Sequence, residues 1–230
     1  MTDVPSGESG QPEGHDLGRL EHAATIEYRH ELVRKAIHLT SLSIPVIYFF
    51  ISKQLALTLL IPMTAAFIIV DVARYYFAPV SEWFYRWFGW LLRRHEQDEK
   101  KKRLNGATNV LISACLCVLL FPKLITVTAF AILIVSDSTS ALVGRRFGKR
   151  RFFDKSLEGS IAFFVSAVLV VFVAPKVAFH PLEYVIGIVA AGVGAIVEAI
   201  SMKVDDNISI PIAVGLVMWG LYAVVMPWSF

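Results

Sequence analysis

The chain has 230 residues, of which 56% are hydrophobic and 18% charged, with a mean hydropathy of +0.60. Soluble domains carry about 25% charged residues, so this composition argues against an ordinary soluble globule. The formal net charge of +3 is too small to indicate a nucleic-acid-binding protein. Cys115 and Cys117 lie two positions apart in an apolar run, where a helix would point them to different sides, so neither a disulfide framework nor a zinc finger is expected. What remains is an all-α, polytopic membrane protein.

Residues 1–25 carry five acidic residues and two prolines and have no apolar core. This composition is typical of a disordered tail and differs from that of a signal peptide. Residues 26–230 are predicted to form a single transmembrane domain, in which apolar stretches recur near the roughly 20 residues that a bilayer requires. We predict about seven transmembrane helices, several of them short enough to need tilt or shielding by neighbours. They are Ala36–Ser52, Leu55–Val72, Ala107–Phe121, Leu124–Val143, Ser160–Ala174, Tyr184–Ile200 and Ile208–Met226.

The segment Ser81–Arg94, between the second and third predicted spans, has a different pattern. Its aromatic and leucine residues recur at helical period, whereas Glu82, Arg86 and Arg93 lie elsewhere on the helical wheel. Several tryptophans beside a membrane boundary favour an interfacial amphipathic helix that lies in the membrane plane. The alternative is a short amphipathic helix packed on the protein's own core.

The distribution of lysine and arginine predicts the orientation in the membrane. Of the 22 Lys and Arg residues, all but Lys53, Lys123 and Lys176 fall in the tail and loops of one side, among them the basic run at 100–103. The positive-inside rule then places the N-terminus in the cytosol and the C-terminus outside. A single chain of this type suits a bacterial plasma membrane.

Polar residues near the span ends gather on the predicted cytosolic side, so we expect one site there. Asp137 stands within the apolar fourth span, and Glu198 follows a long apolar run in the sixth. An ionised carboxylate in hydrocarbon costs several kcal/mol unless it is paired or bound to a metal, so both are candidates for a functional role. Asp71 and Arg74, spaced i to i+3, have the simpler explanation of a helix-end ion pair.

The loop after the fourth span has Gly144 and Gly148 among five cations. Glycine lets the backbone approach a phosphate, turn N–H groups can bind an anion, and arginine and lysine supply charge. The segment Lys155–Ser160 follows at a span entrance, where Ser160 could cap the helix and direct its N-terminus at the same anion. Together with carboxylates that can hold Mg²⁺ through oxygen ligands, these groups match what phosphoryl transfer requires.

Three separated segments between Glu31 and Pro211 resemble a known family. The string SDSTSALVGRRFGKRRFFDKSLEGS at 136–160 resembles the signature of CTP-dependent polyprenol and lipid kinases, which comprise dolichol kinase, phytol kinase and fungal-type CTP-dependent diacylglycerol kinase. ELVRKAIHL at 31–39 is similar to the family's first-span motif, and the segment from Glu198 to Pro211 is similar to its closing motif. The short chain is closest in size to phytol kinase. It departs from many relatives at Ser136, where they carry glycine.

The resemblance implies a membrane phosphotransferase that moves the γ-phosphate of CTP, with Mg²⁺ as cofactor, to the hydroxyl of a membrane alcohol. That alcohol would be phytol, geranylgeraniol, a longer polyprenol or diacylglycerol. By motif position the catalytic candidates are Asp137 and Lys155, with His38 as the reserve base, and the metal ligands are Asp137, Glu198 and Asp206. All but one of the nucleotide-binding candidates lie in the same motifs, and the exception, Asn109, stands at the start of the third predicted span. The candidates are Arg34, Lys35, Asn109, Gly144, Arg145, Arg146, Gly148, Lys149, Ser156, Glu158, Gly159, Ser160 and Asn207.

Other functions stay open at this stage, as does assembly into a homo-oligomer. A cytidylyltransferase acting on a phosphatidate-like lipid would need similar cations and metal ions but would release pyrophosphate. A small ion-coupled transporter would use Asp137 and Glu198 to carry ions, but it needs polar residues through the full depth of the bilayer, and the outer halves of these spans are nearly all apolar. A non-catalytic scaffold would not need carboxylates in hydrocarbon.

Overall fold

The computed structural model describes residues 32–89, 104–200 and 204–227. The predicted disordered tail, the basic run at 100–103 and the last residues of the predicted interfacial helix lie outside these ranges. The described backbone is helical apart from connecting turns and one small antiparallel hairpin, β1 (Arg151–Phe152) with β2 (Lys155–Ser156). The all-α expectation is therefore confirmed, and the hairpin is an element that it missed.

A first helical segment covers residues 32–40 and is separated by a turn from α2. The other helices follow in chain order. They are α2 (Ser43–Phe50), α3 (Lys53–Ala73), α4 (Ala78–Phe88), α5 (Gly106–Leu120), α6 (Lys123–Phe147), α7 (Leu157–Val173), α8 (Pro181–Ala199) and α9 (Asp206–Val225).

Within the described ranges, four helices are long and apolar enough to cross a membrane, namely α3, α6, α8 and α9. Helices α5 and α7 are apolar but have only 15 and 17 residues. The predicted first span is not one continuous helix, because the chain turns at Ser41 and Leu42. Pro45 lacks the N–H that would bond to the carbonyl of Ser41, which favours a break at this point. The structure thus bears out a helical, membrane-type architecture without confirming the number seven.

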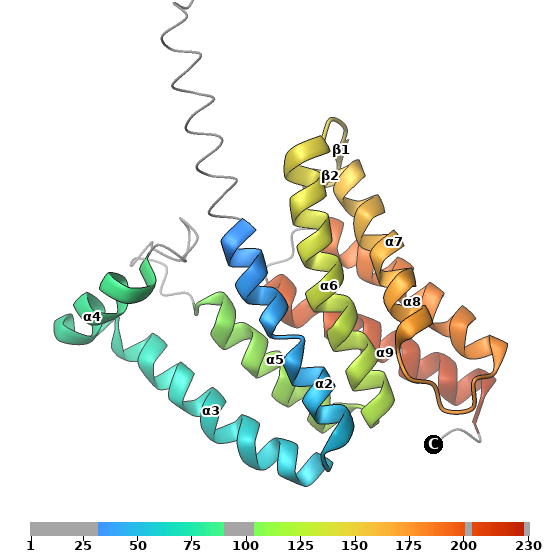
Figure 1. Cartoon of the computed structure of the whole chain (residues 1–230), viewed down its shortest axis with the longest axis horizontal. Helices are drawn as coiled ribbons and strands as arrows, with labels where there is room; N and C mark the ends of the chain where they lie inside the picture. The colour runs from blue at the N-terminus through green and yellow to red at the C-terminus, as the bar shows by residue number, and fades with distance from the viewer. Residues whose placement is uncertain (1–31, 90–103, 201–203, 228–230) are drawn as a thin grey trace, which may run out of the picture.

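Helix α6 is the centre of the bundle. It packs against α7, α9 and α2. In its 18-residue apolar stretch 72% is buried, against 22% in that of α3. Figure 1 shows α3 and α5 side by side on one flank, with α4 turned away at the end of α3. Helices α7, α8 and α9 cover the other flank (Figure 1). The core between them is aliphatic and aromatic, as in the fully buried Leu133 and Phe163.

Small residues let α6 and α7 approach closely. A Cβ atom on Gly144 would lie 2.8 Å from Ser156 Oγ. A Cβ atom on Gly159 would lie 3.1 Å from the carbonyl oxygen of Ser140 and 3.3 Å from Gly144 Cα. Gly148, four residues after Gly144, has no room for a side chain either. Small residues at four-residue spacing are a common basis of close helix packing in membranes, so these glycines have a packing role.

The three lysines predicted on the external side each cap carbonyl groups near a helix C-terminus. Lys53 Nζ donates to the carbonyl of Leu119 at 2.9 Å and Lys123 Nζ to that of Ile51 at 2.7 Å. Lys176 Nζ donates to the carbonyl oxygen directly after α7, at 2.6 Å. A cation is favourable at this end of a helix dipole. Lys53 and Lys123 begin α3 and α6, and Lys176 lies in the α7–α8 loop. These segments are at the end of the bundle away from the hairpin (Figure 1).

Candidate functional site

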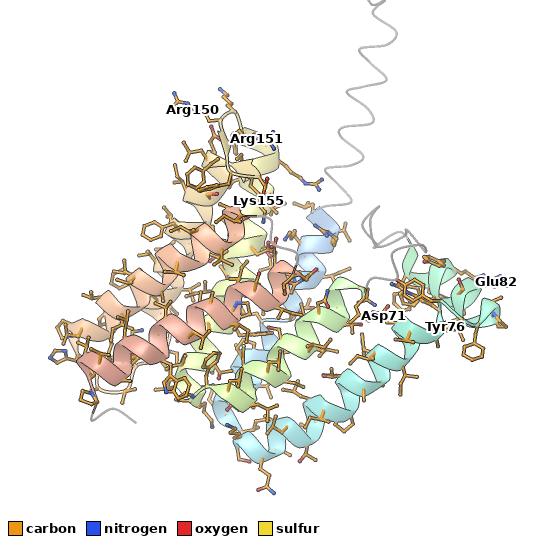
Figure 2. All side chains as sticks on the ribbon, turned by 180° about the vertical axis from the view of Figure 1, so that it is seen from behind. Asp71, Tyr76, Glu82, Arg150, Arg151 and Lys155 are labelled. Atoms are coloured by element: carbon orange, nitrogen blue, oxygen red, sulfur yellow. The ribbon has the colours of Figure 1, made fainter. Side chains whose placement is uncertain are left out.

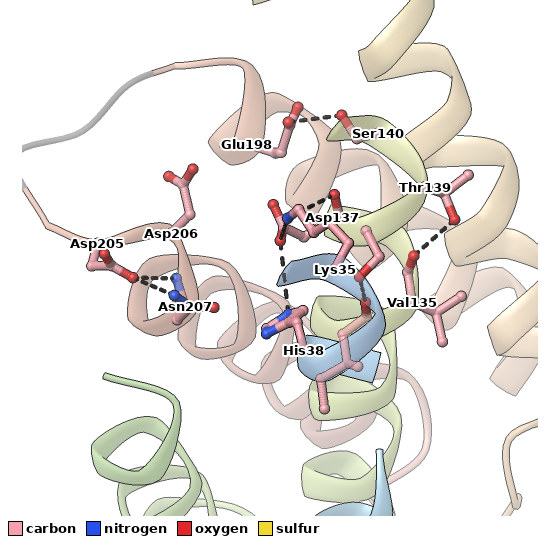
Figure 3. A network of polar contacts seen from close by, with 12 residues as sticks. Lys35, His38, Val135, Asp137, Thr139, Ser140, Glu198, Asp205, Asp206 and Asn207 are labelled. Carbon is pink, nitrogen blue, oxygen red and sulfur yellow. Dashed lines mark hydrogen bonds and ion pairs between the residues drawn. The ribbon is translucent and has the colours of Figure 1, made fainter. Parts of the chain in front are cut away.

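The carboxylate of Asp137 is buried in α6 and forms an ion pair with Lys35 of the segment 32–40. Lys35 Nζ also donates to the backbone carbonyl of Asp137 at 3.4 Å. His38 Nε2 lies 3.7 Å from Asp137 Oδ2 (Figure 3). Both Lys35 and Asp137 are almost fully withdrawn from solvent, and pairing is what makes burial of the two charges tolerable. The segment 32–40 and α6 therefore meet through two residues that are 102 positions apart in the sequence.

A second cluster is centred on Lys155 of the hairpin. Its Nζ donates to Glu198 Oε1 at 2.8 Å and to Asp206 Oδ2 at 2.9 Å. Ser140 donates to the same oxygen of Glu198 at 2.8 Å. Burial acts to lower the pKa of Lys155, but the carboxylates of Asp206 and Glu198 outweigh it and raise that pKa above its usual value. The ammonium group therefore stays charged around neutral pH.

The two clusters are neighbours. Ser140, which donates to Glu198, follows Asp137 by three residues in α6. Figure 3 shows Asp137, Glu198 and Asp206 on three different helices around one region. Asn207, in the first turn of α9 beside them, donates to Asp205 Oδ1 at 2.7 Å. Residues from the segment 32–40, α6, the hairpin, α8 and α9 thus gather at one end of the bundle.

The predicted metal ligands Asp137, Glu198 and Asp206 do not form a ready-made cluster. Within residues 32–89, 104–200 and 204–227, no group of three or more His, Cys, Asp or Glu side chains could hold a metal ion as placed. Lysine ammonium groups contact these carboxylates instead. Glu198 Oε2 is nevertheless buried with no hydrogen-bond partner in the described part of the chain, which is unusual for a buried oxygen. Carboxylate oxygens are the donors that Mg²⁺ prefers, so the chemistry of the set fits that ion.

The loop after α6 differs from the anion-binding turn that we predicted. Helix α6 continues through Phe147, and the backbone N–H groups of Lys149 and Arg150 donate to the carboxylate of Glu158, at 3.0 and 3.3 Å. The donors expected to hold a phosphate are therefore used by a side chain of this protein. Glu158 lies in the first turn of α7, where a negative charge is favourable.

The predicted helix cap at Ser160 is wrong. Ser156 caps α7 by accepting from the backbone N–H of Gly159 at 3.2 Å. Ser160 lies a turn further on, inside the helix and buried. The reason is that α7 begins at Leu157, directly after the strand Lys155–Ser156, and not at the end of an open loop.

The cations of this loop separate into two groups. Lys155 belongs to the buried cluster, whereas Arg145, Arg146 and Lys149 are exposed around the end of α6. Figure 2 shows Arg150 and Arg151 at the start of the hairpin, at the outer end of the bundle. The exposed cations form a rim around the end of the bundle that holds the carboxylates.

A cavity of about 470 Å³ opens beside the Lys35–Asp137 pair. This volume is within the roughly 300–1,000 Å³ typical of small-molecule sites. Its polar lining residues are Arg34, Lys35, His38, Ser41, Asn105, Asp137 and Asn207, and an apolar wall is formed by Ile37, Ala66, Phe67, Val70, Trp83, Phe84, Phe88, Ala107 and Val110. Asn109 is buried in α5 and is not among the lining residues. We did not predict the apolar wall, because apolar residues of a span carry no local signal that separates a cavity from a lipid-facing surface.

A buried polar network holds that wall. Asp71 of α3 is fully buried and accepts from the backbone and side-chain nitrogens of Asn105, at 2.8 and 2.9 Å, and from Thr108 Oγ1 at 2.7 Å. Arg74 lies 3.3 Å from Asp71, so the predicted helix-end ion pair is confirmed. The Arg74 guanidinium also lies 4.6 Å from the centre of the Phe84 ring in α4. Figure 2 shows Asp71 where the end of α3 meets the start of α5.

Comparison with known proteins finds distant similarity to a protein with a named activity, a kinase. No protein-family model matches the chain, and no solved structure matches it. An uncharacterized protein of Rickettsia prowazekii is 29% identical over 82% of this chain and 93% of its own length. An uncharacterized protein of Methanocaldococcus jannaschii is 27% identical over 82% of this chain and 92% of its own. The CTP-dependent diacylglycerol kinase 1 of Schizosaccharomyces pombe is 28% identical over 80% of this chain and 90% of its own. The chain is thus an all-helical protein with membrane-spanning candidates that is distantly similar to a CTP-dependent lipid kinase.

Proposed function

We propose that the protein is an integral membrane kinase that transfers the γ-phosphate of CTP to the hydroxyl of a membrane alcohol. The observation that carries the proposal is the meeting of the Lys35–Asp137 pair with the Lys155–Glu198–Asp206 cluster at one end of the bundle. Phosphoryl transfer needs this combination of cations and carboxylates more than it needs covalent chemistry from the protein. The similarity to a CTP-dependent diacylglycerol kinase supports both the nucleotide and the class of acceptor.

In the proposed reaction, the acceptor oxygen bonds to the γ-phosphorus while the bond from that phosphorus to the β–γ bridging oxygen breaks, and CDP leaves. The hydroxyl proton passes to a protein base, for which Asp137 is the first candidate and His38, 3.7 Å away, the second. Lys155 and the exposed arginines neutralise the phosphate oxygens. Asp137, Glu198 and Asp206 are the residues that would hold Mg²⁺, whose charge also neutralises these oxygens.

We also propose the predicted topology of seven crossings, with the site at the cytosolic side of a bacterial plasma membrane. The segment from residue 32 to the end of α2 and the shorter helices α5 and α7 would then cross beside the four longer ones, shielded by their neighbours. The carbonyl-capping lysines at the opposite end of the bundle support this orientation. Helix α4 would lie in the interface, which agrees with the exposed rings of Trp83 and Trp87.

The test is a transfer assay with purified protein in lipid bilayers, Mg²⁺, and CTP or ATP labelled at the α- or γ-phosphate. The acceptors are phytol, geranylgeraniol, a long polyprenol and diacylglycerol, and the products are separated by thin-layer chromatography. We expect γ-label from CTP to enter lipid. Entry of α-label with release of pyrophosphate would instead identify a cytidylyltransferase, and no transfer to any acceptor would overturn the proposal. Lys155→Met should lose transfer, whereas Lys123→Met, at the other end of the bundle, should keep it.

A further inference from the structure

We propose that the cavity between the segment 32–40, α3, α4 and α5 is the acceptor site. In this inference the hydroxyl end of a membrane alcohol lies at the Lys35–Asp137 end of the cavity and its hydrocarbon chain lies along α3 and α4. The chemical class of the ligand rests on the proposed function, whereas the place of the site rests on the shape and lining of the cavity.

The cavity has the polarity that such a ligand requires. Lys35, His38 and Asp137 are at one end, next to the place where the proposed transfer occurs. Ala66, Phe67 and Val70 line the far wall; their spacing of i, i+1 and i+4 places them on one face of α3. A hydroxyl needs hydrogen-bonding partners and a hydrocarbon chain needs none, so the gradient orients an alcohol with its reactive end toward Asp137.

The rim of the cavity indicates where the ligand enters. Large apolar side chains around it are exposed, among them Ile37, Phe67, Trp83 and Phe88. Contiguous exposed apolar surface of this kind marks contact with lipid or another apolar ligand. The negative charges of a nucleotide do not suit the apolar rim of the cavity. They suit the exposed arginines beside the Lys155 cluster. The two substrates would therefore approach the same carboxylates from different sides.

The wall is also held in a defined shape, which a surface merely facing lipid does not need. Asp71 binds the start of α5 through Asn105 and Thr108, and Arg74 connects the end of α3 to the Phe84 ring of α4. One buried polar network thus fixes α3, α4 and α5, three of the elements that line the cavity. Because a buried carboxylate is expensive to maintain, its use at this position supports a wall whose geometry matters.

Two adjacent alanines of α3 allow a matched test. Ala66 lines the cavity, whereas Ala65 does not, and both are exposed. In the transfer assay with geranylgeraniol, Ala66→Phe should raise the KM for the alcohol by roughly tenfold or more and leave the KM for CTP unchanged. Ala65→Phe should behave as the wild type. Equal behaviour of the two variants, or a parallel rise of both KM values in Ala66→Phe, would overturn the inference.

A binding experiment separates this inference from the proposed function. A geranylgeraniol analogue with a diazirine in its hydrocarbon chain, away from the hydroxyl, is photo-crosslinked to the full-length protein in nanodiscs, and the modified peptides are mapped by mass spectrometry. We expect labelling of α3 and α4 in the wild type and in Ala65→Phe, and its loss in Ala66→Phe. Labelling spread over the outer helix faces would overturn the acceptor site even if the kinase is active. Specific labelling without any phosphoryl transfer would uphold the site and refute the kinase.

Discussion

Two buried acids at the hairpin end of this bundle are each paired with a cation from a distant part of the chain. Asp137 is paired with Lys35 and Glu198 with Lys155. Two charges withdrawn from water are tolerable only together, since removal of one partner leaves the other uncompensated in a medium of low dielectric constant. Substitution of one partner and of both partners therefore has different consequences, and the difference separates a structural role from a catalytic one.

Asp137→Asn leaves the ammonium of Lys35 buried, with 3% of the residue exposed, and without its carboxylate partner. We expect the free energy of unfolding to fall by about 3–5 kcal/mol and γ-phosphate transfer to disappear. The double variant Lys35→Met/Asp137→Asn should recover most of the stability without recovering transfer. Thermal unfolding in detergent and the transfer assay, run on all three proteins, check this. If the double variant regained activity together with stability, Asp137 would have no part in the chemistry.

Lys155 should set an alkaline limit to stability. Its pKa is raised above the ordinary lysine value of about 10.4 by Asp206 and Glu198, which outweigh burial. Its ion pairs therefore contribute fully below about pH 10.4, and this contribution is lost as the pH rises through the folded-state pKa. Lys155→Arg keeps its charge in that range. The melting temperature of the wild type should differ from that of Lys155→Arg by a constant amount between pH 7 and 9 and fall relative to it above about pH 10.4. A difference that already changes below pH 9 would contradict this assignment.

At the scale of elements, the contact between α6 and α7 decides where the hairpin lies. Ser140, Gly144 and Gly159 bring the two helices together just before and after the loop that carries Lys155. Ser140 also donates to Glu198, so the same contact is continuous with the site. Separation of these helices would move Lys155 away from its carboxylates.

Gly159→Leu should force α6 and α7 apart, because even a Cβ atom would lie 3.1 Å from the carbonyl oxygen of Ser140. Overpacking of this kind typically costs about 1–3 kcal/mol, and we expect a comparable loss of unfolding free energy together with weaker transfer. Gly220→Ala is the control, since a Cβ atom there meets nothing within 4 Å. It should keep transfer and lose no stability. Equal melting temperatures for Gly159→Leu and the wild type would show that the close approach is not needed.

The helices of the bundle were predictable because apolar runs of span length are a local signal. The ends of α3 and α9 fall within two residues of the predicted spans. Pro45 is a local reason for the break in the first predicted span. The prediction of one continuous helix followed instead from the apolar residues on both sides of it. The hairpin was not predictable from periodicity, since two-residue strands are too short to show alternation.

The candidate site was predictable only in part, and for a different reason. Asp137 and Glu198 stand out because a carboxylate in an apolar run needs a partner. Their particular partners, Lys35 and Lys155, come from positions 102 and 43 residues away, which no local pattern identifies. We predicted that Glu158 binds the nucleotide, but we did not predict that it accepts hydrogen bonds from the backbone N–H groups of Lys149 and Arg150. That contact depends on a turn whose shape is set by tertiary packing.

At the scale of the whole molecule, the two ends of the bundle differ in kind. The end with the hairpin holds buried ion pairs and exposed cations. At the other end, the three lysines donate to the backbone carbonyls of helix ends. A site that uses a charged nucleotide and a lipid must stand at a boundary between water and hydrocarbon, and the first end meets this requirement if it faces the cytosol.

Single cysteines in a background without Cys115 and Cys117 test this orientation. Arg151→Cys lies at the hairpin, whereas Gln54→Cys and Val177→Cys lie at the opposite end, and all three positions are exposed. A membrane-impermeant maleimide should label positions 54 and 177 in intact bacterial cells and position 151 only after permeabilisation. The reverse pattern would mean that the hairpin end faces the outside, where cytosolic CTP could not reach the site. Labelling of all three from outside would mean that the helices do not separate the two ends, and the proposed placement of the site would then be wrong.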